Sequence, residues 1–194
     1  MTKINSLCIY CGSRSSNNKN FQILAKRMGE ILAKNNIKLI YGGGNVGLMG
    51  IIATSTLKNG GEVHGIIPSH LHETEVAHEH LTKLTIVDNM HQRKRMMFDQ
   101  SDAFIVLPGS IGTLDETIEA ITWKQLKLHD KPIILLNSEN YWEPFIDLLK
   151  NIISYDFMTD DTLKLFNVVN SAEEVLPLLE KLPEPKIDPK NTLI

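Results

Sequence analysis

The stretch IKLIYGGGNVGLMG, residues 37–50, decides the expected fold. A mainly apolar run of five residues leads directly into three glycines, Gly42–Gly44, and two more glycines, Gly47 and Gly50, stand where a helix is expected to begin. Glycine permits positive φ and a close approach of the backbone, so this pattern is typical of a tight strand-to-helix turn.

The alternation of short apolar runs with longer helical patterns continues along the chain. Expected strands, rich in Ile, Val and Leu, cover residues 7–11, 37–41, 63–67, 84–87, 103–107, 132–136 and 166–169. The clearest helix covers residues 20–34, where apolar residues recur at helical spacing. Near-continuous apolar strands alternating with helices indicate a parallel sheet covered on both faces. We therefore expect an α/β fold with a doubly wound, mostly parallel sheet of about seven strands.

A length of 194 residues with 42% hydrophobic and 22% charged residues suits one hydrophobic core. Residues 1–182 are expected to form a single domain. Three prolines follow the expected helix at 171–181 and cannot continue it, so residues 183–194 are expected to be an extended or mobile tail.

Charge and composition narrow the class of protein. The formal net charge of −3 and the mixing of both signs along the chain provide no broad cationic field, so nucleic acid is not an expected partner. The sequence shows no secretory signal and no apolar stretch long enough for a membrane helix, so a cytoplasmic protein is expected. Cys8 and Cys11 form a CxxC within an apolar run. The period of a strand turns them to opposite faces, which favours two buried thiols over a redox pair.

Three expected strands end in polar or glycine-rich turns, and ligands of open parallel sheets bind at such ends. These turns are CGSRSSNN at 11–18, YGGGNVGLMG at 41–50 and LPGSIGTLDE at 107–116. A single glycine turn is equally well explained without a ligand, and the turn YGGGNVGLMG has no GKS or GKT, so it is not a Walker loop. Two glycine-rich turns on neighbouring strand ends favour a cradle for a mononucleotide or phosphosugar.

The helical pattern MHQRKRMMFDQSD, residues 90–102, carries a cluster of charge. Four of its residues share one side at helical spacing: Met90, Arg93, Lys94 and Met97. Arg95 points elsewhere and can pair with Asp99. Taken alone, the residues favour a solvated basic face above buried methionines. The alternative is that the two cations meet a phosphate.

Several of these motifs, in this order and spacing, resemble the LOG (Lonely Guy) family, whose older label is lysine decarboxylase-like. The motifs are CGS, YGGGNVGLMG, IP after the third strand, EVAH, MHQRK, PGSIGTLDE and ITWKQLKLHDKPIILLN, and they span roughly residues 7–180. The resemblance implies a Rossmann-like nucleotide-binding fold and a homodimer with the site near its interface. It further implies hydrolysis of cytokinin riboside 5'-monophosphates or AMP to free base and ribose 5-phosphate, without a cofactor or metal.

The resemblance also implies roles for individual residues. Arg93 and Glu116 match the catalytic pair, and Lys94 matches a second substrate-binding cation. The other positions expected to contact substrate are Gly12, Ser13, Gly43, Gly44, Glu75, Met90, Gly109, Ser110, Ile111, Gly112, Thr113, Asp115 and Thr122.

Two expectations concern the turn before the helix that carries Glu116. Ser110 stands where the family has the second glycine of PGG, and if that position needs positive φ, Ser110 is strained and narrows the phosphate loop. Glu116 is expected in the first turn of a helix, where the helix dipole lowers its pKa and keeps it ionised. A carboxylate there would stabilise the positive charge that develops on a sugar when its N-glycosidic bond breaks.

Other readings of the sequence are less favoured. A pyridoxal-phosphate lysine decarboxylase would be far larger and needs a Schiff-base lysine that nothing here marks. A cluster of histidines and glutamates lies in a polar loop without the HExxH spacing of a zinc site, so a solvated loop is favoured there. Its members are His70, His72, Glu73, Glu75, His78, Glu79 and His80. A non-catalytic nucleotide or phosphosugar binding protein on the same fold is the main alternative function.

Overall fold

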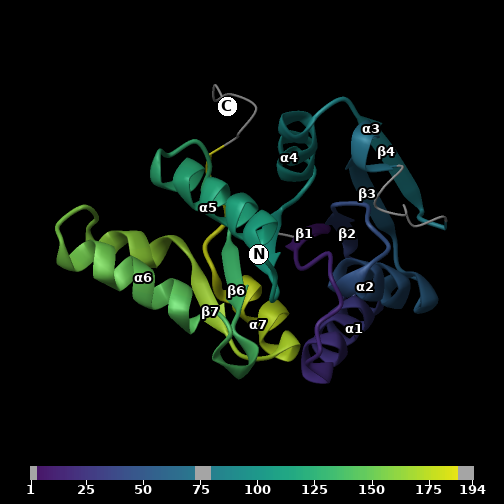
Figure 1. Ribbon diagram of the computed structural model, residues 1–194, viewed down its shortest axis with the longest axis horizontal. Coiled ribbons are helices and arrows are strands. Elements are labelled where there is room, and N and C mark those ends of the chain that lie inside the picture. Colours follow the sequence, from purple (N-terminus) through teal and green to yellow (C-terminus); the bar gives the residue numbers. More distant parts are fainter. Residues whose placement is uncertain (1–3, 73–79, 188–194) are drawn as a thin grey trace.

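The computed structural model describes residues 4–72 and 80–187, and its centre is one sheet of parallel strands (Figure 1). The strands are β1 (Ser6–Tyr10), β2 (Lys38–Tyr41), β3 (Val63–Pro68), β4 (Lys83–Val87), β5 (Ala103–Val106), β6 (Ile133–Leu136) and β7 (Asn167–Val169). Their order is β4-β3-β2-β1-β5-β6-β7, and each neighbouring pair is parallel. The order reverses direction between β1 and β5, so the predicted doubly wound, Rossmann-like sheet is confirmed.

Helices cover both faces of the sheet. They are α1 (Lys19–Lys34), α2 (Gly47–Lys58), α3 (Ser69–His72), α4 (Met90–Asp99), α5 (Ile111–Gln125), α6 (Glu143–Ser154) and α7 (Val175–Lys181). Short 3-10 turns η1 (Ser138–Asn140), η2 (Asp160–Leu165) and η3 (Ala172–Glu174) lie near the C-terminal strands. The predicted helix at 20–34 is α1, which starts at Lys19 because the Asn18 side chain accepts a hydrogen bond from the Asn20 N–H at 2.9 Å.

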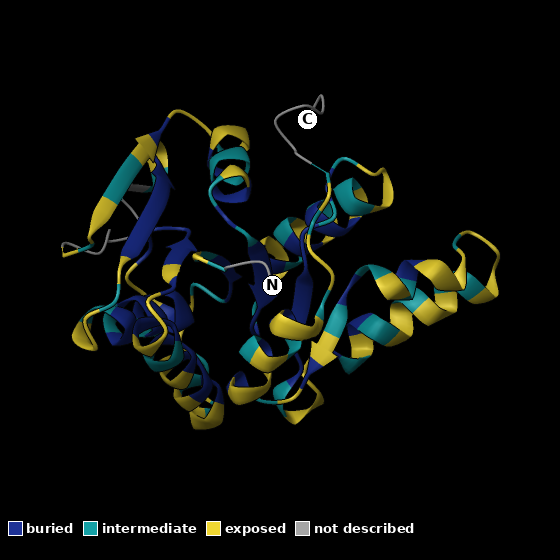
Figure 2. Ribbon diagram, turned by 180° about the vertical axis from the view of Figure 1, so that it is seen from behind, coloured by how far each residue is buried: buried dark blue, intermediate teal, exposed yellow. Residues whose placement is uncertain are grey.

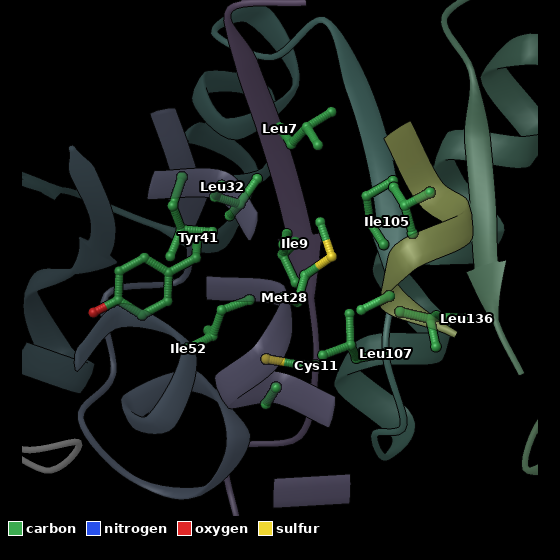
Figure 3. Packing of buried hydrophobic residues seen from close by; sticks show 14 of the residues in the cluster. Leu7, Ile9, Cys11, Met28, Leu32, Tyr41, Ile52, Ile105, Leu107 and Leu136 are labelled. Atoms are coloured by element: carbon green, nitrogen blue, oxygen red, sulfur yellow. The ribbon is translucent and has the colours of Figure 1, made fainter. Parts of the chain in front are cut away.

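Two hydrophobic clusters lie on opposite faces of the sheet, because successive residues of β1 belong to different clusters. Figure 2 shows that the central strands are buried. One cluster contains buried residues of α1, α2 and α7, and the other contains residues of α4, α5 and α6. Around β1, the side chains of Leu7, Ile9 and Cys11 belong to the first cluster (Figure 3). Cys8 belongs to the second, and both thiols are free and buried. The prediction of two buried thiols on opposite faces is therefore confirmed.

The C-terminal region follows the predicted helix only in part. η3 and α7 occupy residues 172–181, and residues 183–187 lie outside any helix or strand. The backbone N–H groups of Lys186 and Ile187 donate to the Asp130 carboxylate at 2.6 and 3.1 Å. The rest of the expected tail falls outside the described residues. Within the described ranges, no helix is long and apolar enough to cross a membrane.

Candidate active site

The reversal of strand order brings three loops together at the carboxyl ends of β1, β2 and β5. Gly12, after β1, joins them: its N–H donates to the Pro108 carbonyl at 3.0 Å, and its carbonyl accepts from the Leu48 N–H at 3.0 Å. β1 lies between β2 and β5, so the prediction that the two glycine-rich turns follow neighbouring strands is wrong. The two turns flank the end of β1 instead.

The glycine turn after β2 packs closely against the loop that follows β1. Gly43 and Gly47 adopt positive φ of 81° and 66°, and a Cβ on Gly47 would lie 2.6 Å from the backbone of Arg14. The Leu48 N–H, at the start of α2, already donates to the Gly12 carbonyl. The glycines after β2 therefore serve a close approach of two loops, and the N-terminus of α2 has a protein acceptor.

Arg93 lies on α4 and is buried, with 7% of its surface exposed. Its guanidinium donates from Nη2 to the Gly42 carbonyl at 2.8 Å, just after β2, and from Nε to the Ile66 carbonyl at 3.2 Å, within β3. Nη1 lies 3.7 Å from the Met90 Sδ. These contacts occupy three of the five guanidinium N–H groups and fix the plane of the fork.

The favoured reading of α4 as a solvated basic face is thus wrong for Arg93. Among the described residues, no carboxylate lies within the 4.0 Å of a salt bridge with it. Arg95, on another side of α4, does pair with Asp99 at 2.8 Å, as predicted. Arg93 is consequently a buried cation with no ion-pair partner in the described part of the chain. Its charge is available to a negatively charged group bound in the adjoining cavity.

Glu116 lies on α5 and faces the same cavity as Arg93. Burial raises the pKa of its carboxyl from 4.5 to about 7, against the opposing effect of Arg93, and Asp115 raises it further. The expectation that the helix dipole lowers this pKa is therefore wrong. Glu116 is the sixth residue of α5, beyond the first turn, where the dipole is strongest, so desolvation outweighs it.

The turn between β5 and α5 places the N-terminus of α5 at the cavity. Ser110 is the N-cap residue with φ −109° and ψ −158°, an extended conformation open to any residue. The expectation of strain at Ser110 is therefore wrong. Its side chain makes no capping hydrogen bond, and it is exposed. Gly109 does need to be glycine, because a Cβ there would lie 2.1 Å from the Thr113 Oγ1.

The cavity between these elements has a volume of about 220 Å³. Predicted residues that line it are Ser13, Met90, Arg93, Ser110, Gly112, Thr113, Asp115 and Glu116. Six other lining residues were not among the expected site residues: Ile9, Cys11, Gly42, Met49, Leu71 and Met97. In the sequence, Ile9 and Cys11 belong to an apolar run and are expected to be buried in the core. Only the structure shows that they also line a cavity, because this cavity lies at the end of β1.

Lys94 is not among the described residues that line the cavity. Its Nζ lies 3.2 Å from Asp115 Oδ2 and 3.1 Å from Glu119 Oε1. These two ion pairs join α4 to α5, which lie side by side (Figure 1). Only 13% of the Lys94 side chain is exposed, so the pairs hold the helix of Arg93 against the helix of Glu116.

Other predicted site residues lie elsewhere. Gly43 and Gly44 are buried and are not among the described residues lining the main cavity, while Gly12 and Gly109 line a second cavity that shares Ser110 with it. Ile111 and Thr122 are exposed on α5 and are not among the described residues lining the main cavity. Glu75 lies outside the described residues.

The metal-site alternative finds no support in the described part of the chain. No group of three or more His, Cys, Asp or Glu side chains is placed there to hold a metal ion. Of the loop cluster, Glu73, Glu75, His78 and Glu79 fall outside the described residues.

Comparison with known proteins shows the family of the chain. A family model described as "Possible lysine decarboxylase" matches residues 49–179. The chain is 41% identical over 175 residues to a protein of Oryza sativa subsp. japonica named "Probable cytokinin riboside 5'-monophosphate phosphoribohydrolase LOGL1", covering 90% of this chain and 78% of that protein. It is 38% identical over 179 residues to "Cytokinin riboside 5'-monophosphate phosphoribohydrolase LOG1" of Arabidopsis thaliana, covering 92% and 84%.

Solved structures match the fold at lower identity. The Moco carrier protein from Chlamydomonas reinhardtii superposes with a TM-score of 0.69 at 19% identity, covering 93% of this chain and all (100%) of that chain. The structural genomics target TM1055 gives 0.71 at 19% identity, covering 92% and 100%. At these identities the likeness concerns the fold alone. The family model and the curated relatives, together with the presence of Arg93 and Glu116 in one cavity, show that the chain belongs to the LOG family of phosphoribohydrolases.

Proposed function

We propose that the protein hydrolyses the N-glycosidic bond of a purine or cytokinin nucleoside 5'-monophosphate, AMP included, releasing the free base and ribose 5-phosphate. The observation that carries the proposal is that Arg93, Glu116 and the N-terminus of α5 face one cavity. The names of the relatives support a cytokinin nucleotide as substrate. AMP shares the ribose 5'-phosphate and the purine ring, which are the parts that such a cavity would recognise.

Glu116 is proposed to act on the sugar. Breaking the bond to the base leaves positive charge on the ribose, and a carboxylate beneath the anomeric carbon stabilises it and orients the attacking water. A pKa of about 7 makes Glu116 a better proton acceptor than an ordinary carboxylate, while half of it is still ionised at neutral pH. A carboxyl that is desolvated but still partly ionised therefore suits a residue that must both carry charge and accept a proton from water.

Arg93 is proposed to act on the leaving base. Its guanidinium is always charged and is a poor proton donor, so its role is to orient the base and to stabilise the negative charge that develops on it. The hydrogen bonds to Gly42 and Ile66 hold the fork before substrate arrives. This preorganisation means that little reorganisation is needed as the bond breaks.

The phosphate is proposed to bind at the N-terminus of α5. Ser110, Gly112 and Thr113 line the cavity there, and the first N–H groups of a helix have no intrahelical acceptor. The Ser110 hydroxyl is available as a further donor because it makes no capping hydrogen bond. Lys94 is already paired with two carboxylates, so its contribution to phosphate binding would act through the position of α4.

We propose that the protein is a homodimer in the cytoplasm, and one exposed face of α5 supports the association. Ile111, Ile118 and Leu126 are 78%, 48% and 63% exposed and recur at helical spacing. Trp123 does not belong to this face, because its ring packs against Phe98 with ring centroids 5.0 Å apart. The exposed face begins beside Ser110, so an interface there would adjoin the site.

Turnover tests the proposal directly. The protein is incubated with AMP and with isopentenyladenosine monophosphate, and free base is separated from nucleotide and quantified over time. Release of base by the wild type, and its loss in Glu116→Gln, is the expected result. Binding of both nucleotides without release of base would instead identify a non-catalytic nucleotide-binding protein.

A further inference from the structure

Tyr141 connects the end of β6 to the turn that begins α5. Its hydroxyl donates to the Gly109 carbonyl at 2.5 Å. Its ring packs edge-on against Phe21, with centroids 5.3 Å apart and an interplanar angle of 82°. A second edge contact, to Trp142, has a centroid distance of 5.0 Å. The ring is thus held on two sides while the hydroxyl reaches the turn of the proposed phosphate site.

The backbone that carries Tyr141 is fixed in an uncommon conformation. Glu139 and Asn140 both adopt left-handed φ, 56° and 58°, which side-chain-bearing residues rarely do. The Glu139 carboxylate accepts hydrogen bonds from the side-chain amides of Asn18 and Asn20 at the start of α1. On the other side of Tyr141, the Trp142 N–H donates to the Asn137 side chain at 2.6 Å. Contacts on both sides therefore determine where Tyr141 lies.

The hydrogen bond to the Gly109 carbonyl also determines the direction of the neighbouring Ser110 N–H. Gly109 C=O and Ser110 N–H belong to the same planar trans peptide, so they point in opposite directions. Tyr141 and Gly109 line a cavity of about 200 Å³ on one side of this peptide, and Ser110 lines both that cavity and the main one. Holding the carbonyl toward Tyr141 directs the Ser110 N–H toward the cavity that contains Arg93 and Glu116. Among the described residues, that N–H has no hydrogen-bond acceptor.

We propose that Tyr141 is a positioning residue that orients the Gly109–Ser110 peptide so that its N–H binds the phosphate of the substrate. The inference rests on the proposed phosphate site at α5. Without the Tyr141 hydroxyl, no described residue donates a hydrogen bond that would keep the Gly109 carbonyl turned away, and the glycine permits the peptide to rotate. Tyr141 does not contact the substrate in this arrangement, so its effect falls on phosphate affinity and leaves recognition of the base unchanged.

The test compares binding of a phosphate-bearing and a phosphate-free ligand by calorimetry. Dissociation constants for inorganic phosphate, ribose 5-phosphate and adenine are measured on the wild type, on Tyr141→Phe and on Tyr155→Phe. The first variant removes the hydroxyl and keeps the ring against Phe21. The second is a matched control, because Tyr155 is 69% exposed at the end of α6. Thermal unfolding confirms that each variant is folded.

Tyr141→Phe is expected to weaken ribose 5-phosphate and inorganic phosphate about fivefold, the effect typical of one hydrogen bond, with adenine unchanged. Tyr155→Phe is expected to bind all three ligands as the wild type does. The inference is overturned if Tyr141→Phe binds both phosphate ligands within twofold of the wild type, or weakens adenine equally. A wild type that binds inorganic phosphate but not ribose 5-phosphate would contradict the proposed function, while the response of Tyr141→Phe to phosphate would still decide this inference.

Discussion

Replacing Gly42 by alanine is expected to disable the site through Arg93 while the chain stays folded. Gly42 is not among the glycines with positive φ, so its backbone conformation accepts alanine. A Cβ there would lie 1.9 Å from Arg93 Nη2 and 2.9 Å from Cζ, with Met49 Sδ next at 3.3 Å. Because unbonded heavy atoms settle about 3.5 Å apart, the guanidinium must retreat by more than about 1 Å.

The expected losses of stability and of activity follow from the hydrogen bond that this displacement of Arg93 breaks. The bond from Nη2 to the Gly42 carbonyl is lost, which costs about 1.5–3 kcal/mol for a charged donor. Alanine in place of glycine offsets up to about 1 kcal/mol of this through the unfolded chain. The net loss of about 0.5–3 kcal/mol is small against the ~5–15 kcal/mol stability of a typical domain. Misplacing a preorganised charge at the reacting centre costs about 100- to 1,000-fold in rate.

The assay is a double-mutant cycle on kcat/KM for base release. Gly42→Ala, Arg93→Ala and the double variant are compared with the wild type, and thermal unfolding is followed for all four. If Gly42 acts through Arg93, the double variant is no slower than Arg93→Ala. Activity of Gly42→Ala within threefold of the wild type would refute the reasoning, as would losses that multiply in the double variant.

Four further outcomes are expected. Ionised Glu116 is the active form, so kcat/KM should rise as pH increases through about 7. Asp115→Asn removes a charge that raises the pKa of Glu116, so it should move this rise to lower pH. A pH profile that is the same in Asp115→Asn and the wild type would contradict this prediction. Glu116→Gln is expected to abolish base release while nucleotide binding is retained. The raised pKa of Glu116 also makes the wild type less stable as pH rises from 4.5 to about 7, so thermal unfolding at pH 8 should show the variant to be the more stable protein. Ser110→Gly relieves no strain and removes a hydroxyl, so KM for a nucleotide rises about fivefold with kcat nearly constant, and an unchanged KM would exclude the hydroxyl from phosphate binding. Sedimentation should give a species larger than the 21.9 kDa chain, and Ile118→Lys should reduce it to monomer; a wild-type monomer at micromolar concentration would exclude the dimer.

Local patterns in the sequence determined the fold. Each strand was predicted within two residues of its observed ends, because a buried parallel strand is recognisable from its own apolar run. The opposite orientation of Cys8 and Cys11 followed from the period of two along one strand. The motif spacing that carries the family resemblance is also a property of the chain read in order, and it named Arg93 and Glu116 without any structure.

Only the tertiary structure decided the environments of those residues. The acceptors that bury Arg93 are the carbonyls of Gly42 and Ile66, which lie 51 and 27 positions away along the chain, so the helical pattern of α4 could not reveal them. The pKa of Glu116 depends on desolvation by surrounding elements, whereas the helix dipole that the sequence suggested is a local effect. The backbone angle of Ser110 follows from how β5 meets α5. Periodicity determines which elements form, but burial, charge and backbone geometry at a site depend on contacts between segments that are distant in sequence.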